Sequence, residues 1–396
     1  MVKELFNSFI HPWEIKAMYN LKFRDKIRQP KKPLVELIDG LDDRDFCYTA
    51  LTKVSRSFAV VIQQLPEDLK DPVCVFYLIL RGLDSIEDDM DFAQEPKLLL
   101  LRSFYEKCEI NNWNMEGVGD SEDYRVLLKH FEKVIGLYLS LKPSYRKVIS
   151  DITKRMGNGM ADFAEKKVYS LDDYNLYCHY VAGLVGIGLS GLFSASTLES
   201  PMLETEERLS NSMGLFLQKT NIIRDYHEDL HSGRIFWPGE VWDKYSSEIG
   251  DFEKAPTQAS SMACLNHLVL DAMQHVEDSL EYMSMLHNKQ IFRFCAIPQV
   301  MAIATLAKVF NNSKVFTSNV KIRKGLGAKL MYYTNDMSNL RFEFHKCLLD
   351  IENKLNPLDP HYLVTKNKVE YLLNITSKEW KNPYYGIQYK LYRMVS

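Results

Sequence analysis

The five-residue pattern Asp-x-x-Glu-Asp occurs twice in the chain, at 84–88 and at 225–229. Positions i, i+3 and i+4 of a helix share one face, so each copy gathers its carboxylates on one stripe. Carboxylates held this close repel one another, which favours a cation bound between them. Oxygen ligands in this number suit Mg²⁺, which usually also takes phosphate oxygens from a substrate. We therefore expect a diphosphate ligand and the metal ligands Asp84, Glu87, Asp88, Asp225 and Asp229, with Glu228 as a further candidate.

Each acidic pattern also has an arginine at its head. Arg81 stands three residues before Asp84, and Arg224 directly precedes Asp225. The guanidinium fork matches phosphate oxygens, which indicates an anion contact at both places. Each pattern follows an apolar run, so both helices are predicted to be buried with their acids at the rim. The alternative is a non-enzymatic helical scaffold whose acidic faces are merely solvated.

The second pattern overlaps His227-Glu-Asp-Leu-His231, which reads as the H-E-x-x-H motif of zinc proteases. Measured from Asp225 at about 100° per residue, Asp229 lies near 40°, whereas the two histidines lie near 200° and 240°. The two sets of ligands would point in opposite directions. No third ligand follows at a familiar spacing, so we expect no zinc protease.

Apolar residues along the chain recur with a period of 3.6 far more often than 2, which predicts an all-α protein with almost no sheet. Asp71-Pro72 is predicted to start a helix, with the acid as N-cap. Two apolar stretches, 180–196 and 294–310, are too short to span a membrane and are interpreted as buried core helices.

Composition sets outer limits on the function. The chain has 396 residues, 46% of them hydrophobic, which is ample for a large core. A net charge of -3 and a pI near 6.4 give no argument for nucleic-acid binding. The seven cysteines are widely spaced, odd in number and without a C-x-x-C pair, which favours reduced thiols in an intracellular compartment.

Several segments together resemble the squalene synthases over nearly the whole chain. Besides the first acidic pattern with its arginine, they are Val54-Ser-Arg56-Ser-Phe58, Tyr177-Cys-His-Tyr-Val-Ala-Gly-Leu-Val-Gly186, Gly214-Leu-Phe-Leu-Gln218-Lys-Thr-Asn221-Ile-Ile-Arg224-Asp225, Gly233-Arg-Ile-Phe-Trp-Pro238, Phe294-Cys-Ala-Ile-Pro-Gln299 and Lys321-Ile-Arg323-Lys-Gly325.

The resemblance implies a single large helical bundle of the isoprenoid (terpenoid) synthase type with a central apolar cavity. We expect an N-terminal arm at 1–45, the catalytic domain at 46–375 and a C-terminal tail at 376–396. In this interpretation the two acid-bearing helices face each other across the cavity, which excludes water from a carbocation.

The activity that the resemblance implies is the head-to-head joining of two farnesyl diphosphates. The first product is presqualene diphosphate, which is then rearranged and reduced by NADPH to squalene for sterol biosynthesis. Ionising the substrate requires that the negative charge of the leaving diphosphate be neutralised. We expect Mg²⁺ to supply the positive charge that does this. The alternative is a phytoene or dehydrosqualene synthase, which uses no NADPH.

The same resemblance assigns roles to individual residues. Tyr177, Phe58 and Phe294 are the predicted catalytic residues, Tyr177 for proton removal or cation stabilisation. The residues that the resemblance places around the nucleotide and the diphosphate are Arg56, Arg81, Arg224, Lys321 and Arg323. Substrate binding is expected of Ser55, Tyr77, Gln218, Asn221 and Arg234.

Squalene synthases usually finish with a hydrophobic anchor that holds them on the endoplasmic reticulum. This chain ends at Ser396 after an aromatic tail, without about 20 consecutive apolar residues. We expect a monomer that works at the cytosolic face of that membrane and is soluble when the anchor is missing.

Overall fold

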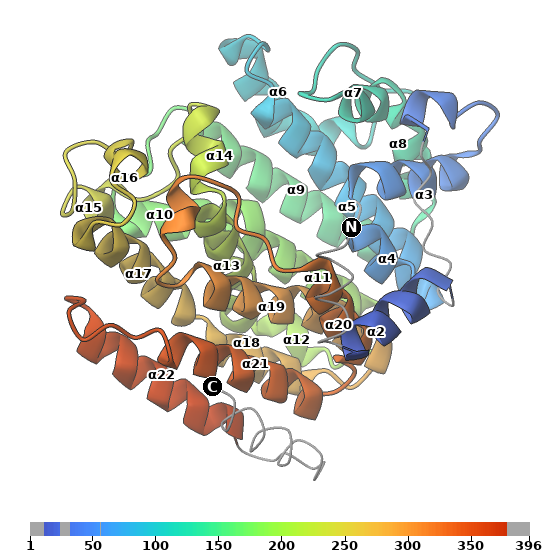
Figure 1. Ribbon diagram of the computed structural model, residues 1–396. Helices are drawn as coiled ribbons and strands as arrows, with labels where there is room; N and C mark the ends of the chain where they lie inside the picture. The colour runs from blue at the N-terminus through green and yellow to red at the C-terminus, as the bar shows by residue number, and fades with distance from the viewer. Residues whose placement is uncertain (1–11, 24–31, 56, 378–396) are drawn as a thin grey trace. The chain divides into compact units, whose positions relative to one another are not determined.

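The computed structural model describes residues 12–23, 32–55 and 57–377. Within these ranges the chain is helical and contains no strand (Figure 1). This confirms the all-α prediction. The chain divides into two compact units, one built from 27–167 and 179–211 and the other from 1–26, 168–178 and 212–396. The domain boundaries predicted from the sequence stay a prediction.

The unit formed by 27–167 and 179–211 carries the first acidic pattern. Its helices are α3 (Asp43–Val54), α4 (Ser57–Ile62), α5 (Glu67–Asp88), α6 (Gln94–Lys107), α7 (Glu122–Lys129), α8 (Phe131–Ser140), α9 (Pro143–Phe163), α11 (Leu184–Ala195) and α12 (Met202–Thr205), with a 3-10 turn η1 (Leu34–Glu36) and a π-helical turn η2 (His179–Gly183).

Helix α5 is the central element of this unit, since it packs against α3, α6, α8, α9 and α11. Leu78, Ile79 and Leu83 are fully buried along it. One neighbour of α5 lies close enough to require a glycine on the helix. A Cβ at Gly82 would lie 2.7 Å from the ring of Phe131. The apolar face of α5 is thus fixed on several sides, which positions the acids at its end.

The other unit carries the second acidic pattern. It holds α2 (Pro12–Phe23), α10 (Leu171–Cys178), residues 212–224 of α13 (Glu207–Arg224), α14 (Tyr226–His231), α15 (Gly239–Trp242), α16 (Asp251–Lys254), α17 (Ala259–Met273), α18 (Val276–Met285), α19 (Lys289–Val309), the 3-10 turn η3 (Ser313–Phe316), α20 (Lys324–Tyr333), α21 (Met337–Glu352) and α22 (Tyr362–Ser377).

Helix α21 packs against both α19 and α22, and α2 lies along α20 (Figure 1). Helix α19 is the most apolar of these. Its N-cap is Asn288, whose side chain accepts hydrogen bonds from the backbone N–H groups of Gln290 and Ile291. This cap satisfies donors that the first helical turn leaves unpaired.

Two helix boundaries differ from the sequence prediction. Helix α5 begins at Glu67, so the predicted start at Asp71-Pro72 is wrong. The acid that was expected to cap the helix instead accepts hydrogen bonds from Arg44 and Tyr48 of α3, at 3.0 and 2.7 Å. The helix starts earlier because Pro66 and the acids that follow it form a favourable first turn.

The second acidic pattern is not part of one continuous helix, because a turn at Asp225 separates α13 from α14. The hydrogen-bond register nevertheless continues. The N–H of Asp225 donates to the carbonyl of Asn221 at 2.8 Å, and the N–H of Asp229 donates to the carbonyl of Asp225 at 2.9 Å. The relation between i and i+4 that the prediction used therefore survives the break.

Two helical stretches, Leu171–Ala195 and Lys289–Val309, are long and apolar enough to cross a membrane. The prediction that these apolar stretches are too short is therefore wrong, because the helices extend further toward the N-terminus than the apolar runs at 180–196 and 294–310. Of their most apolar windows, 56% and 78% respectively is buried inside the protein, which supports their interpretation as core helices. All seven cysteines lie in the described part of the chain, and each is buried and free of disulfides. The free cysteines agree with the reduced thiols that the sequence predicts.

Candidate active site

The first acidic pattern ends α5 and is held by Arg81. The guanidinium Nη1 of Arg81 lies 2.6 Å from Oδ2 of Asp84. The guanidinium carbon Cζ lies over the rings of Tyr77 and Tyr124, 5.8 and 5.3 Å from their centroids. Ser85, which follows Asp84 in the chain, is buried. Burial opposes the charge of Arg81, but the nearby Asp84 carboxylate raises the pKa of the guanidinium. The arginine is therefore a fixed cation beside the acids.

Part of this arginine is available to a ligand. Its Nε atom is buried and has no hydrogen-bond partner among the described residues. A buried N–H donor without an acceptor is costly, and an anion would remove that cost. The Asp84, Glu87 and Asp88 side chains are half-buried. Carboxylate oxygens beside a guanidinium donor are a set that fits a magnesium diphosphate.

The end of α5 is fixed by Lys97 of α6, a residue that sequence reasoning did not single out. Its buried Nζ donates to the backbone carbonyls of Glu87 and Asp89, at 3.0 and 2.5 Å. The Asp89 carboxylate accepts the N–H groups of Asp91, Phe92 and Gly119. Burial alone would raise the pKa of Asp89, but these three hydrogen bonds lower it. Asp89 therefore terminates the helix and takes no part in the stripe.

Two further predicted residues of this unit, Ser55 and Phe58, lie at the end of α3 and in α4. The Ser55 hydroxyl accepts the N–H of Ala59 and so has a structural contact. Phe58 is 38% exposed, and its ring centroid lies 5.9 Å from that of Tyr77. The exposed Phe58 ring and the half-buried Tyr77 ring could contact an apolar substrate. Arg56 lies outside the described residues.

The second acidic pattern repeats the pairing of the first. Nε and Nη2 of Arg224 form a fork on both carboxylate oxygens of Asp225. Burial opposes the charge on Arg224, but the hydrogen bonds that it donates to Asp225 raise the pKa of the guanidinium. Arg234 Nη2 lies 3.5 Å from Oδ1 of Asp229. The Glu228 side chain points toward Asn319, since its carboxylate accepts a hydrogen bond from Nδ2 of Asn319 at 2.8 Å. Asp225 and Asp229 are thus the stronger ligand candidates here.

Helix α13 is held by a buried ion pair that sequence analysis missed. Lys219, 1% exposed, donates to Oδ2 of Asp271 on α17 at 2.7 Å. Its ammonium also lies 5.3 Å from the ring centroid of Tyr174 on α10. The neighbouring candidates Gln218 and Asn221 are half-buried and exposed respectively. The pair fixes the helix from which these side chains project.

Tyr177 of α10 is 8% exposed and stacks on Phe236, with ring centroids 5.1 Å apart and an interplanar angle of 17°. Phe236 belongs to the segment between Gly233 and Pro238 and was not predicted as a site residue. Phe294 of α19 is also buried. The structure thus gives Tyr177 a rigid aromatic support.

The basic segment before α20 contains an arginine that is already paired with an acidic residue of the same protein. Nη2 of Arg323 donates to Oε1 of Glu14 on α2 at 2.6 Å. A Cβ at Gly325 would lie 2.4 Å from the other oxygen of Glu14. Lys321 is exposed. An N-terminal acid thus holds the arginine that was predicted to contact the nucleotide.

The structure brings the predicted residues into two groups. Within one unit lie Ser55, Phe58, Tyr77, Arg81, Asp84, Glu87 and Asp88; within the other lie Tyr177, Gln218, Asn221, Arg224, Asp225, Asp229, Arg234, Phe294, Lys321 and Arg323. Sequence reasoning missed the supporting residues, which are Lys97, Tyr124, Phe236, Asp271 and Glu14. No local spacing signals them, because each acts across a tertiary contact.

Comparison with known proteins gives consistent matches. The model of the family described as squalene/phytoene synthase matches residues 51–325. Squalene synthase BSS of Botryococcus braunii is 53% identical over 321 residues, which cover 79% of this chain and 68% of that protein. Squalene synthase of Schizosaccharomyces pombe is 49% identical, covering 80% and 70%. A solved complex of TcSQS with a ligand is 43% identical, with a TM-score of 0.83, and covers 85% of this chain and 98% of that one.

Proposed function

The chain belongs to the squalene/phytoene synthase family and is a farnesyl-diphosphate farnesyltransferase, and we propose that it forms squalene with the help of Mg²⁺ and NADPH. Two farnesyl diphosphates are joined to presqualene diphosphate, which is then reduced. Its relatives place the activity in sterol biosynthesis. Each stage begins with the loss of diphosphate, so the site must stabilise a leaving anion twice.

One observation carries this proposal. In each acidic pattern the arginine at the head is bonded to the first aspartate, Arg81 to Asp84 and Arg224 to Asp225. Five of these acids, Asp84, Glu87, Asp88, Asp225 and Asp229, are half-buried, whereas Glu228 is exposed. Charged groups held in partly desolvated positions are typical of functional sites and are not expected of a solvated scaffold.

We propose that Asp84, Glu87, Asp88, Asp225 and Asp229 hold the magnesium ions. When bound, Mg²⁺ supplies positive charge that neutralises the departing diphosphate. The arginines contribute in the same direction, because their guanidinium groups donate to phosphate oxygens. Since Asp84 and Asp225 already fix these donors, little reorganisation is needed when charge develops.

Tyr177 is proposed to act on the first stage, by proton removal or by stabilising the cation. Its stacking on Phe236 fixes the ring plane, so the phenol oxygen keeps one direction. An unperturbed phenol is a poor base at neutral pH, which makes the departing diphosphate the better final acceptor of the proton. Phe58 and Phe294 offer π faces that attract a carbocation.

The reducing stage is proposed to use NADPH, which supplies hydride. Lys321, Arg323 and Arg56 are its proposed phosphate contacts, and exposed Lys321 is accessible to such a ligand. When the nucleotide binds, Arg323 would release the Glu14 carboxylate and bind a phosphate group instead. We further propose that the enzyme works as a monomer at the cytosolic face of the endoplasmic reticulum, because a long hydrocarbon product partitions into a membrane.

Product analysis tests the proposal. The chain is incubated with farnesyl diphosphate and Mg²⁺, with and without NADPH, and the hydrocarbon is identified by mass. We expect squalene with NADPH and presqualene diphosphate accumulating without it. A phytoene or dehydrosqualene synthase would give the same more unsaturated hydrocarbon in both incubations, which would overturn the proposal. Release of no diphosphate would favour the non-enzymatic scaffold.

A further inference from the structure

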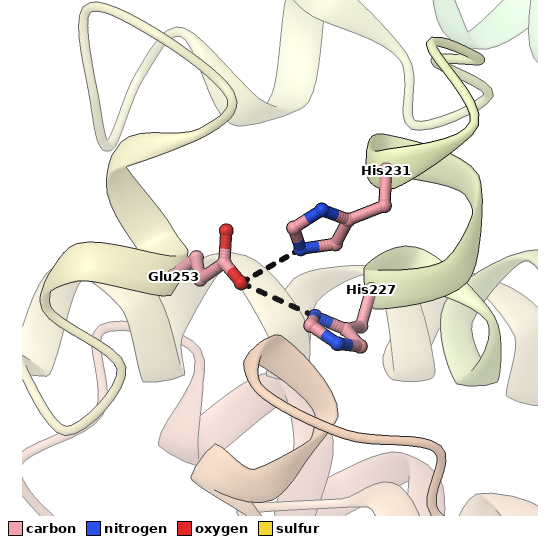
Figure 2. Close-up of side chains that lie close together, drawn as sticks. All are labelled: His227, His231 and Glu253. Carbon is pink, nitrogen blue, oxygen red and sulfur yellow. Dashed lines mark hydrogen bonds and ion pairs between the residues drawn. The ribbon is translucent and has the colours of Figure 1, made fainter.

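Three side chains of types that can bind a metal ion lie close together between α14 and α16. His227 and His231 stand one turn apart on α14, with ring centroids 4.5 Å apart. Both point toward Glu253 of α16 (Figure 2). Oε1 of Glu253 lies 2.9 Å from Nε2 of His231 and 3.3 Å from Nδ1 of His227. The third ligand that the sequence did not reveal is therefore supplied by another helix.

The backbone beneath these side chains is well anchored. Tyr226, next to His227, and Phe252, next to Glu253, are both buried and belong to one aromatic cluster with Trp237. The Tyr226 hydroxyl also donates to the carbonyl of Ile249, just before α16. The two helices are thus tied together independently of the three polar side chains. Preorganised ligands lose little entropy when they bind an ion.

The ligand atoms have suitable separations. All three lie within 4.8 Å of one another. At a metal-nitrogen distance of about 2.0 Å, neighbouring ligands in a tetrahedron are about 3.3 Å apart. The contact of His227 with Glu253 already has this length, and that of His231 with Glu253 needs to open by a few tenths of an ångström. The two histidine nitrogens lie within 4.8 Å of each other, so a rotation of the imidazole rings brings them to tetrahedral spacing. In addition, Nδ1 of His227 is buried, and its 3.3 Å contact with Glu253 does not have the geometry of a hydrogen bond. A bound ion would give this nitrogen a directed bond.

The type of donor selects the ion. Two imidazoles and one carboxylate favour borderline transition metals such as zinc over Mg²⁺, which prefers oxygen alone. Two histidines and a glutamate leave the fourth position of zinc to water. We propose that His227, His231 and Glu253 form a transition-metal site that binds one zinc-type divalent ion and fastens α14 to α16. The site is separate from the carboxylates of Asp225 and Asp229.

The structure does not favour peptidase chemistry at this site. In an H-E-x-x-H enzyme the glutamate between the histidines serves as the base for a metal-bound water. Here Glu228 accepts a hydrogen bond from Asn319 at 2.8 Å. The proposed role is therefore a structural one, a clamp between two short helices next to the second acidic pattern.

Cobalt provides a direct test, because Co²⁺ replaces zinc and absorbs strongly in a tetrahedral site. The purified full chain is titrated with Co²⁺ in excess Mg²⁺, which keeps the carboxylate patterns occupied. We expect an absorption band that saturates at one Co²⁺ per chain and is displaced by Zn²⁺. His231→Asn and Glu253→Gln should abolish the band. His130→Asn is the matched control, since His130 lies 3.7 Å from Glu132 without a second histidine, and it should keep the band.

Melting curves provide a second readout that separates loss of binding from loss of fold. Each variant should show the far-UV circular dichroism of the parent. Zn²⁺ should raise the Tm of the parent and of His130→Asn but leave the Tm of His231→Asn and Glu253→Gln unchanged. Absence of a saturable band in the parent would overturn the proposal. It would equally be overturned if folded His231→Asn and Glu253→Gln kept the band.

Discussion

The buried pair of Lys219 and Asp271 makes a quantitative prediction about the unit that carries the second acidic pattern. The Lys219 side chain is 2% exposed and that of Asp271 is 19% exposed. Removing one partner of a buried ion pair leaves an uncompensated charge and typically costs about 3–5 kcal/mol. Asp271→Asn leaves the more deeply buried ammonium, so we expect a cost near the upper end. Lys219→Met leaves the more exposed carboxylate, for which about 3 kcal/mol is expected.

The double variant Lys219→Met/Asp271→Leu removes both charges at once. Since apolar replacement of a buried pair is often neutral or stabilising, its cost should be far below the sum of the single costs. Thermal unfolding followed by circular dichroism measures this. For a unit of this size, 3 kcal/mol corresponds to about 6–12 °C in Tm. Single variants that lose less than about 1 kcal/mol, or a double variant whose loss equals the sum, would refute the reasoning.

Three smaller predictions rest on single contacts. Gly186→Ala places a Cβ 2.2 Å from the carbonyl oxygen of Ser210, so overpacking should cost about 1–3 kcal/mol in urea unfolding. Burial lowers the pKa of His275 to about 4. Because the unfolded chain then takes up the proton first as pH falls below about 6.5, stability should drop by about 2 kcal/mol between pH 7 and pH 5. His275→Gln should flatten this pH profile, and an unchanged profile would contradict the assignment. Arg323→Met should raise the KM for NADPH while release of the first diphosphate keeps its rate; equal effects on both stages would count against a nucleotide contact.

The helical class and both acidic patterns could be predicted because their signals are local. A period of 3.6 and the spacing of i, i+3 and i+4 depend only on helix geometry. The pairing of Arg81 with Asp84 follows from the same geometry, since the two residues stand three positions apart on α5. The start of α5 does not coincide with Pro72, because Pro66 and the acids Glu67 and Asp68 already form a favourable first turn.

The supports of the site could not be predicted in this way. Lys97 reaches the end of α5 from another helix, and Glu253 meets two histidines that the sequence analysis had set aside. Glu14 comes from the far N-terminal part of the chain to bind Arg323. Such contacts depend on how whole helices pack, and no short spacing in the sequence encodes them.

The central claim is that both acidic patterns, together with Mg²⁺, are needed to release diphosphate from farnesyl diphosphate. The direct measurement is the release rate at saturating Mg²⁺ for the parent, Asp84→Asn and Asp225→Asn. The control is Asp91→Asn, an exposed acid outside both patterns. We predict that each pattern variant loses at least about 100-fold, that the control keeps its rate, and that chelation of Mg²⁺ stops the parent. Parent-like release by either pattern variant, or release without divalent ions, would contradict the account.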